Sequence, residues 1–193
     1  MFKKRRKFTF SLAINKVIKI LIFSDLLIIS GYGLIRPIFP LFITGNIEGG
    51  NLQVVGFASA ILIISESIFQ IPFAKLIDKI KGERDDFWAM LIGSLIYSGI
   101  PIFYLIVNTP MQLYFVQFIY GVAGAITLPA WYAIFTRHID KRHEGYDWSV
   151  YRTLVGIGTA LAATIGGIIA NKYGFVPLFI LVVIMNYIGS LSL

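Results

Sequence analysis

Charged and amide side chains interrupt the long apolar segments of this 193-residue chain. They include Asp25, Arg36, Glu66, Gln70, Gln117 and Arg152. A charge is costly to bury in hydrocarbon, so these residues are candidates for substrate binding, ion pairing or proton transfer. Glu66 lies near the middle of its segment and could release and rebind a proton. At helical spacing it shares one stripe with Ser59 and Gln70.

A second stripe joins Asp25 to Arg36. The two residues are eleven positions apart, which at helical periodicity leaves them within about 20° of one another. Tyr32 lies between them on the same stripe. Asp25 and Arg152 are expected at a similar depth, where they could form an ion pair. In the plainer interpretation these two only neutralise each other, and Arg36 extends to the outer surface.

Six long apolar segments must position these residues. The chain is 57% hydrophobic and 14% charged, whereas a soluble domain carries about 25% charged residues. A helix needs about 20 mainly apolar residues to cross a bilayer. Six segments reach that length, at about 17–44, 52–77, 87–108, 112–136, 149–170 and 175–193. We therefore predict one all-α membrane domain over residues 1–193, with residues 1–16 as a basic cytoplasmic or interfacial lead.

Lysine and arginine are distributed unevenly between the connections. The first and third connections carry none, and the fifth carries only Lys172. The N-terminus and the second and fourth connections carry Lys3, Lys4, Arg5, Arg6, Lys7, Lys79, Lys81, Arg84, Arg137, Lys141 and Arg142. Because cytoplasmic loops are rich in lysine and arginine, we expect a multi-pass protein of the cell membrane with both termini in the cytoplasm.

The composition argues against several classes of function. Without cysteine there are no disulfides, thiolate nucleophiles or cysteine metal sites. His138 and His143 have no convincing further ligand nearby, so we expect neither a metal nor a cofactor. No paired aspartates or nucleophile constellation indicates an intramembrane enzyme. The net charge of +7 is better explained by topology and anionic lipid headgroups than by nucleic acid.

The connection after the second segment carries a motif that we call the signature loop. Its key positions are Ala74, Asp78, Lys79, Gly82 and Arg84. The loop resembles the Gly-x-Leu-Ala-Asp-Arg-x-Gly-Arg-Arg motif of the major facilitator superfamily, with alanine for the first glycine and one extra residue before Gly82. A similar stretch, 167–174, follows the fifth segment. Such an internal echo is typical of three-plus-three inverted repeats.

Glycine and proline patterns extend this resemblance. Gly31, Pro37 and Pro40 match the Gly-x5-Pro-x-x-Pro pattern of drug-antiporter-like members. The fifth segment resembles the antiporter pattern Gly-x3-Gly-Pro-x-x-Gly-Gly, with alanine at the Gly-Pro pair, through residues that include Gly156, Gly166 and Gly167. These small residues could serve close helix packing, movement of the fifth helix, or both.

Two positions of the fourth segment have alternative interpretations. Gln117 stands where the superfamily pattern has an arginine linked to proton transfer, which leaves proton coupling open. Trp131 and Tyr132 follow Pro129 and could contact a substrate. An interfacial anchor is the favoured interpretation, because tryptophan and tyrosine prefer that depth.

The resemblance implies the N-terminal half of a transporter, built as a 3+3 inverted-repeat bundle of six membrane helices. It implies secondary transport of a small molecule by alternating access, with efflux favoured and protons as candidate coupling ions. Full members hold the substrate between two such halves, and the signature loop latches against the second. The chain would need a second half, a homodimer partner or the rest of a longer chain. The alternative is a six-helix membrane scaffold without transport activity.

Overall fold

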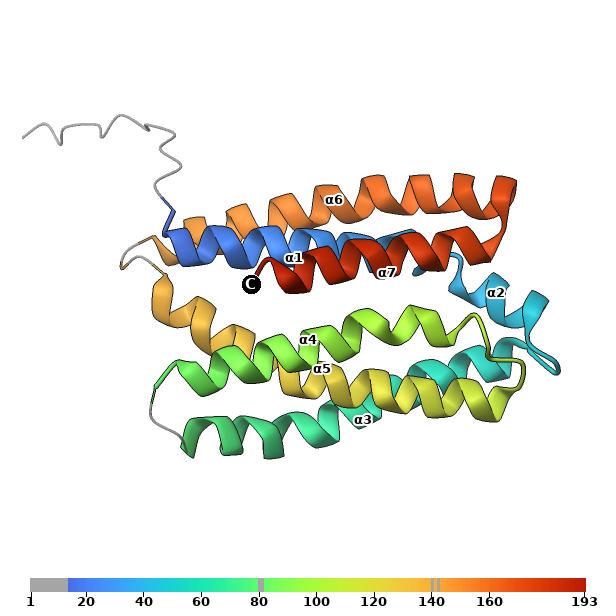
Figure 1. Ribbon diagram of the computed structural model, residues 1–193, viewed down its shortest axis with the longest axis horizontal. Helices are drawn as coiled ribbons and strands as arrows, with labels where there is room; N and C mark the ends of the chain where they lie inside the picture. The colour runs from blue at the N-terminus through green and yellow to red at the C-terminus, as the bar shows by residue number, and fades with distance from the viewer. Residues whose placement is uncertain (1–13, 80–81, 140, 142) are drawn as a thin grey trace, which may run out of the picture.

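A computed structural model describes residues 14–79, 82–139, 141 and 143–193 (Figure 1). Within them the regular elements are helices: α1 (Lys16–Ile35), α2 (Phe39–Asn46), α3 (Leu52–Lys79), α4 (Arg84–Phe103), α5 (Pro110–His138), α6 (Glu144–Tyr173) and α7 (Phe175–Leu191). The all-α prediction is confirmed. Most of the predicted basic lead, together with Ile80, Lys81 and Arg142, lies outside the described residues.

Five of the described helices are long and apolar enough to cross a membrane, namely α1, α3, α4, α5 and α6. The apolar helix α7 has 17 residues, at the lower end of the range for a spanning helix. The sixth span therefore stays a prediction.

Two helix boundaries differ from those expected from hydropathy. The segment predicted as one helix over 17–44 forms α1 and α2, because Pro37 lacks an N–H and its ring clashes with the preceding turn. The segment predicted over 87–108 begins at Arg84 and ends at Phe103. Its last residues, up to Asn108, are as apolar as the helix but form turns before Thr109 caps α5. Hydropathy alone does not mark such an end.

The long helices pack in two groups, seen as the lower and upper layers of Figure 1. In one group α5 contacts both α3 and α4, and in the other α1 contacts both α6 and α7. Contacts of α4 with α7, and of α1 with α5, join the groups. Glycines let the main pairs approach closely: a Cβ at Gly121 would lie 2.0 Å from the Ser65 Oγ of α3, and one at Gly166 would lie 1.9 Å from the Leu34 carbonyl oxygen of α1.

The two ends of the bundle differ in what they carry (Figure 1). One end holds the start of α1 and the α3–α4 and α5–α6 connections, with Lys79, Arg84, Arg137 and Lys141. We call this the basic end. The opposite end, which we call the α2 end, holds α2 and the α4–α5 and α6–α7 connections.

Candidate functional site

A cavity of about 360 Å³ lies toward the α2 end. Its volume falls in the range of small-molecule pockets. Residues of α1, α2, α3 and α5, and of the turns after α1 and α4, line it: Tyr32, Ile35, Arg36, Phe39, Pro40, Val55, Ser59, Leu62, Ile63, Tyr104, Gln117 and Tyr120. We call it the α2-end cavity.

The break between α1 and α2 shapes one wall of the cavity. Tyr32 and Arg36 are one helical turn apart, and both line it. Because α1 ends at Ile35, the chain turns before Phe39 and Pro40 begin α2 on the same wall. The proline pattern of the first segment thus builds part of this site.

Three tyrosines form a polar network within the bundle. The Tyr32 hydroxyl donates to the backbone oxygen of Tyr97, and the Tyr120 hydroxyl donates to the Tyr97 hydroxyl at 2.9 Å. The rings of Tyr32 and Tyr120 stack with centroids 5.1 Å apart, and Tyr97 meets both edge-on. The network presents rigid aromatic surface to the α2-end cavity while its hydroxyls stay hydrogen-bonded.

Gln117 and Arg36 supply the other polar atoms of the wall. The Tyr104 hydroxyl donates to Gln117 Oε1 at 3.2 Å, and the Gln117 side chain is nearly buried. Arg36 is exposed, and its guanidinium makes no hydrogen bond or ion pair with any residue that the structure describes.

The structure therefore brings Tyr32, Arg36 and Gln117 to one cavity. Glu66 and Gln70 are half-buried on α3 and do not line it. Glu66 instead faces α5, where a Cβ added at Gly124 would lie 3.2 Å from Glu66 Oε2.

Asp25 has a partner that the sequence did not predict. The Tyr151 hydroxyl of α6 donates to Asp25 Oδ2 at 2.9 Å. Arg152 is exposed, and the expected ion pair with Asp25 is not formed. Neighbouring residues on a helix point about 100° apart, so when Tyr151 faces α1 the next residue turns away from it.

An aromatic cluster fills the bundle near Tyr151. Trp131 is 4% exposed, stacks on Phe135 at 4.7 Å and lies 5.0 Å from the Tyr151 ring. The expectation that Trp131 is an interfacial anchor is therefore wrong. Its neighbour Tyr132 is exposed and could still serve as one.

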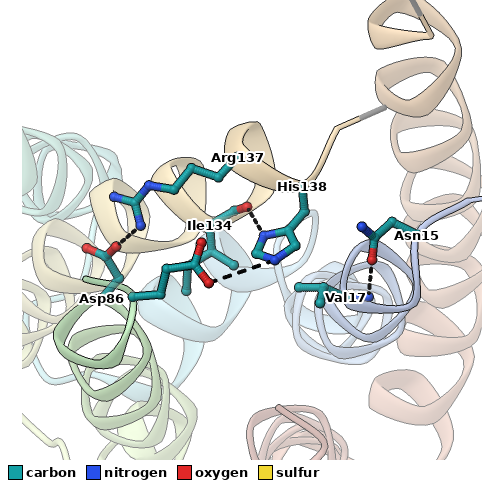
Figure 2. A network of polar contacts seen from close by, with 7 residues as sticks. Asn15, Val17, Asp86, Ile134, Arg137 and His138 are labelled. Atoms are coloured by element: carbon teal, nitrogen blue, oxygen red, sulfur yellow. Dashed lines mark hydrogen bonds and ion pairs between the residues drawn. The ribbon is translucent and has the colours of Figure 1, made fainter. Parts of the chain in front are cut away.

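Two ionic contacts lie at the basic end (Figure 2). Arg137 Nη1 donates to Asp86 Oδ2, and the Asp86 side chain is 1% exposed. Beside them His138 Nε2 lies 3.8 Å from Glu83 Oε2, and His138 Nδ1 lies 2.9 Å from the Ile134 carbonyl oxygen. At the start of α1, Asn15 accepts a hydrogen bond from the Val17 N–H at 2.9 Å.

In the signature loop, Asp78, Lys79 and Arg84 are exposed and Ala74 is half-buried. Gly82 has a φ of 136°, which favours glycine. The buried, paired carboxylate of this region is Asp86, which lies outside the motif.

The glycines predicted to serve helix packing differ in whether another helix lies against them. A Cβ at Gly31 would collide with the side chain of Asn186 on α7, so Gly31 allows a close contact there. Gly156 and Gly167 face open space. Close packing of α6 against α1 therefore depends on Gly166 rather than on those two positions.

Sequence reasoning missed Asp86, Tyr97, Tyr104 and the role of Tyr120. A signal existed for the tyrosines: Tyr97 and Tyr104 are seven positions apart, which puts them on one helix face. Nothing marked Asp86 in advance, because its partner Arg137 lies 51 positions away.

No group of histidine, aspartate and glutamate side chains among the described residues could hold a metal ion.

Comparisons with known proteins identify relatives of the chain. The model of the Major Facilitator Superfamily matches residues 21–193. The multidrug resistance protein MdtG of Escherichia coli strain SMS-3-5 / SECEC is 29% identical over 191 residues, which cover 96% of this chain and 46% of the relative. MdtG of strain K12 / DH10B is 28% identical with the same coverage. The chain thus spans about half the length of these curated relatives.

A solved structure resembles the fold. The crystal structure of the POT family transporter PepTSo matches with a TM-score of 0.76 at 14% sequence identity. The match covers 92% of this chain and 36% of that one. At this identity the likeness concerns the fold alone.

Proposed function

The chain belongs to the Major Facilitator Superfamily, and from this we propose that it contributes one half of a secondary transporter that moves a small molecule across the cell membrane by alternating access. The family and its relatives are transporters, so an enzyme is set aside. The observation that carries the proposal is the α2-end cavity of this apolar bundle, which Tyr32, Arg36 and Gln117 all line.

We propose that the bundle has six spans arranged as 3+3 inverted repeats, with α1 and α2 together as the first span and α7 as the sixth. The main helix contacts support this, because they map onto one another when the two sets of three spans are exchanged. The α3–α5 contact then corresponds to α6–α1, and α4–α5 corresponds to α7–α1. The α4–α7 and α1–α5 contacts map onto themselves.

Exchanging the two sets of three spans also pairs α3 with α6, which are the least buried of the five long helices. In their most apolar stretches only 17% of α3 and 17% of α6 is buried, against 44% to 61% for α1, α4 and α5. Curated relatives are about twice as long as this chain. We propose that a second six-helix half covers these faces, supplied by a longer chain, a separate chain or a second copy. A six-helix scaffold without transport is the alternative.

Efflux is the proposed direction, since the similar proteins MdtG are named for multidrug resistance. Protons are the proposed coupling ions. Glu66 is the first candidate carrier because it is half-buried on α3 and faces Gly124. Asp25 is the second, because its one described hydrogen bond comes from a neutral tyrosine hydroxyl.

Transport is tested by reconstitution of the chain in proteoliposomes, alone and with a complementary six-helix half. Fluxes of 1-naphthoate, 1-naphthylmethanol and ethidium are measured with and without a proton gradient. We expect flux of at least one probe when two halves are present. Absence of flux under every condition would favour the scaffold.

The position of the second half is tested by crosslinking in membranes, since the chain has no cysteine of its own. For the homodimer, Ile64→Cys on α3 should form a disulfide-linked dimer under mild oxidation. Ile92→Cys on α4 is the matched control, because the two isoleucines are 57% and 52% exposed. Equal crosslinking at both positions would contradict the proposed interface.

We also propose that the basic end faces the cytoplasm. The exposed residue Lys79 ends α3 at the basic end, and the exposed residue Glu48 lies in the connection before α3 at the α2 end. In right-side-out vesicles an impermeant maleimide should label the Glu48→Cys variant and spare the Lys79→Cys variant. The reverse pattern would overturn this orientation.

A further inference from the structure

We infer that the α2-end cavity takes a small amphipathic anion, in which an aromatic ring lies on tyrosine and a carboxylate or sulfonate is held by Arg36 and Gln117. This inference rests on the proposed transport function and names the substrate class of the same site. Arg36 carries the one formal charge among the residues that line the cavity.

The tyrosine hydroxyls of the lining are already committed as donors. Tyr32 donates to the Tyr97 backbone oxygen, Tyr120 donates to the Tyr97 hydroxyl, and Tyr104 donates to Gln117. Their protons are therefore unavailable to a ligand unless the network rearranges. What these residues offer the cavity is ring surface, to which the stacked pair of Tyr32 and Tyr120 contributes.

Gln117 is oriented by its neighbour to act as a donor. Its side-chain oxygen accepts from Tyr104, so the NH₂ group is the part left for another partner. That NH₂ group donates to no residue in the described part of the chain. An amide held in this way favours an acceptor such as a carboxylate oxygen.

Arg36 and Gln117 lie on the same side of the tyrosine stack. Helix α1 runs from the basic end to the α2 end, and α5 runs in the opposite direction (Figure 1). Arg36 is one turn after Tyr32 along α1, while Gln117 is one turn before Tyr120 along α5. Both donors therefore stand beyond the rings toward the α2 end, where they can meet one anionic group.

The carboxylates of Glu66 and Asp25 do not pair with the Arg36 guanidinium. Glu66 faces Gly124, and Asp25 is bonded to Tyr151. Neither residue lines the α2-end cavity. A cationic ligand could use the tyrosine faces through cation–π contacts, but it would meet the unpaired guanidinium of Arg36. An anion meets both donors and no like charge, and the apolar lining receives the rest of the molecule.

The test measures equilibrium binding of three probes of one shape to the full chain in lipid nanodiscs. The probes are 1-naphthoate, 1-naphthylmethanol and 1-naphthylmethylammonium, which differ mainly in charge. We expect 1-naphthoate to bind at least about ten-fold more tightly than either analogue, as a charge-assisted hydrogen bond would give. Equal affinity for all three, or tightest binding of the ammonium probe, would overturn the inference.

Variants locate the binding site. Arg36→Gln should weaken 1-naphthoate binding by about ten-fold and change 1-naphthylmethanol binding less than about two-fold. Gln117→Glu can keep the bond from Tyr104 and should also weaken 1-naphthoate selectively. The control is Arg152→Gln, which removes an exposed arginine that does not line the cavity. If Arg152→Gln weakens binding as much as Arg36→Gln, the inference is wrong.

This outcome is separable from that of the transport proposal. Binding can be measured on the chain without a second half, whereas flux depends on one. Charge-selective binding without flux would overturn the transport proposal alone. Flux without charge selectivity would overturn the anion inference alone.

Discussion

The two ends of the bundle each carry an arginine, but only one of the two arginines is ion-paired in the part of the chain that the structure describes. At the basic end Arg137 is bonded to Asp86, whose carboxylate is almost fully buried. At the α2 end Arg36 is exposed and has no partner within the described residues. The first arginine compensates a buried charge and so stabilises the fold, while the second is left available to a ligand.

The aromatic residues differ between the ends as well. Trp131, Phe135 and Tyr151 pack directly on one another toward the basic end. Tyr32 and Tyr120 also stack, yet they border a cavity of about 360 Å³. Aromatic content therefore does not distinguish the two ends, whereas the cavity beside Arg36 and the Gln117 amide does.

The largest expected effect concerns the two arginines. Arg137→Gln leaves the Asp86 carboxylate buried without its ion pair and should lower the free energy of unfolding by about 3 kcal/mol. Arg36→Gln should change it by less than about 0.5 kcal/mol. Unfolding of both variants in detergent by SDS titration measures these values. Similar losses in the two variants would mean that the ends are not distinct.

A smaller effect is expected where α6 meets α1. Gly166→Ala would place a methyl group against the Leu34 carbonyl and should cost about 2 kcal/mol. The neighbouring Gly167→Ala meets open space and should leave stability unchanged or slightly raised. The same SDS titration compares them. Equal costs would show that α1 and α6 do not depend on this close approach.

The smallest effect concerns the tyrosine network. Tyr120→Phe removes the hydroxyl that donates to Tyr97 and should cost about 1 kcal/mol. Tyr114→Phe is the control, because the Tyr114 hydroxyl makes no hydrogen bond with the described residues. Thermal unfolding followed by circular dichroism suits this comparison. A Tyr120→Phe variant as stable as the control would indicate that the network adds little.

Helix content and some of the residues that line the cavity could be predicted from the sequence. Long apolar runs predict helices because lipid leaves few other ways to satisfy the backbone. The periodicity of the first helix put Tyr32 and Arg36 on one stripe, and both line the cavity. The break after Ile35 was missed because hydropathy continues through Pro37, although proline chemistry marks the position.

Hydrogen-bond partners on different helices could not be predicted from the sequence. Asp25 bonds to Tyr151 and Asp86 to Arg137, at separations of 126 and 51 positions. Which residue of α6 faces α1 depends on the rotation of both helices, which is set by close contacts such as that of Gly166 with Leu34. If α6 were rotated by one residue, about 100°, Arg152 would face α1 in place of Tyr151.

The central claim, that the ligand occupies the α2 end and not the basic end, is tested most directly by thiol protection in this cysteine-free chain. Ser59 lines the cavity, whereas Ser149 lies near the start of α6 at the basic end. Both serines are exposed and donate to the carbonyl four residues earlier, at 2.9 Å and 2.6 Å, so Ser59→Cys and Ser149→Cys are matched.

The rate of maleimide labelling of each variant is measured in nanodiscs with and without saturating 1-naphthoate. We predict that the probe slows labelling of the Ser59→Cys variant by at least about five-fold and leaves the Ser149→Cys variant unchanged. Protection of the Ser149→Cys variant alone, or equal protection of both, would contradict the account.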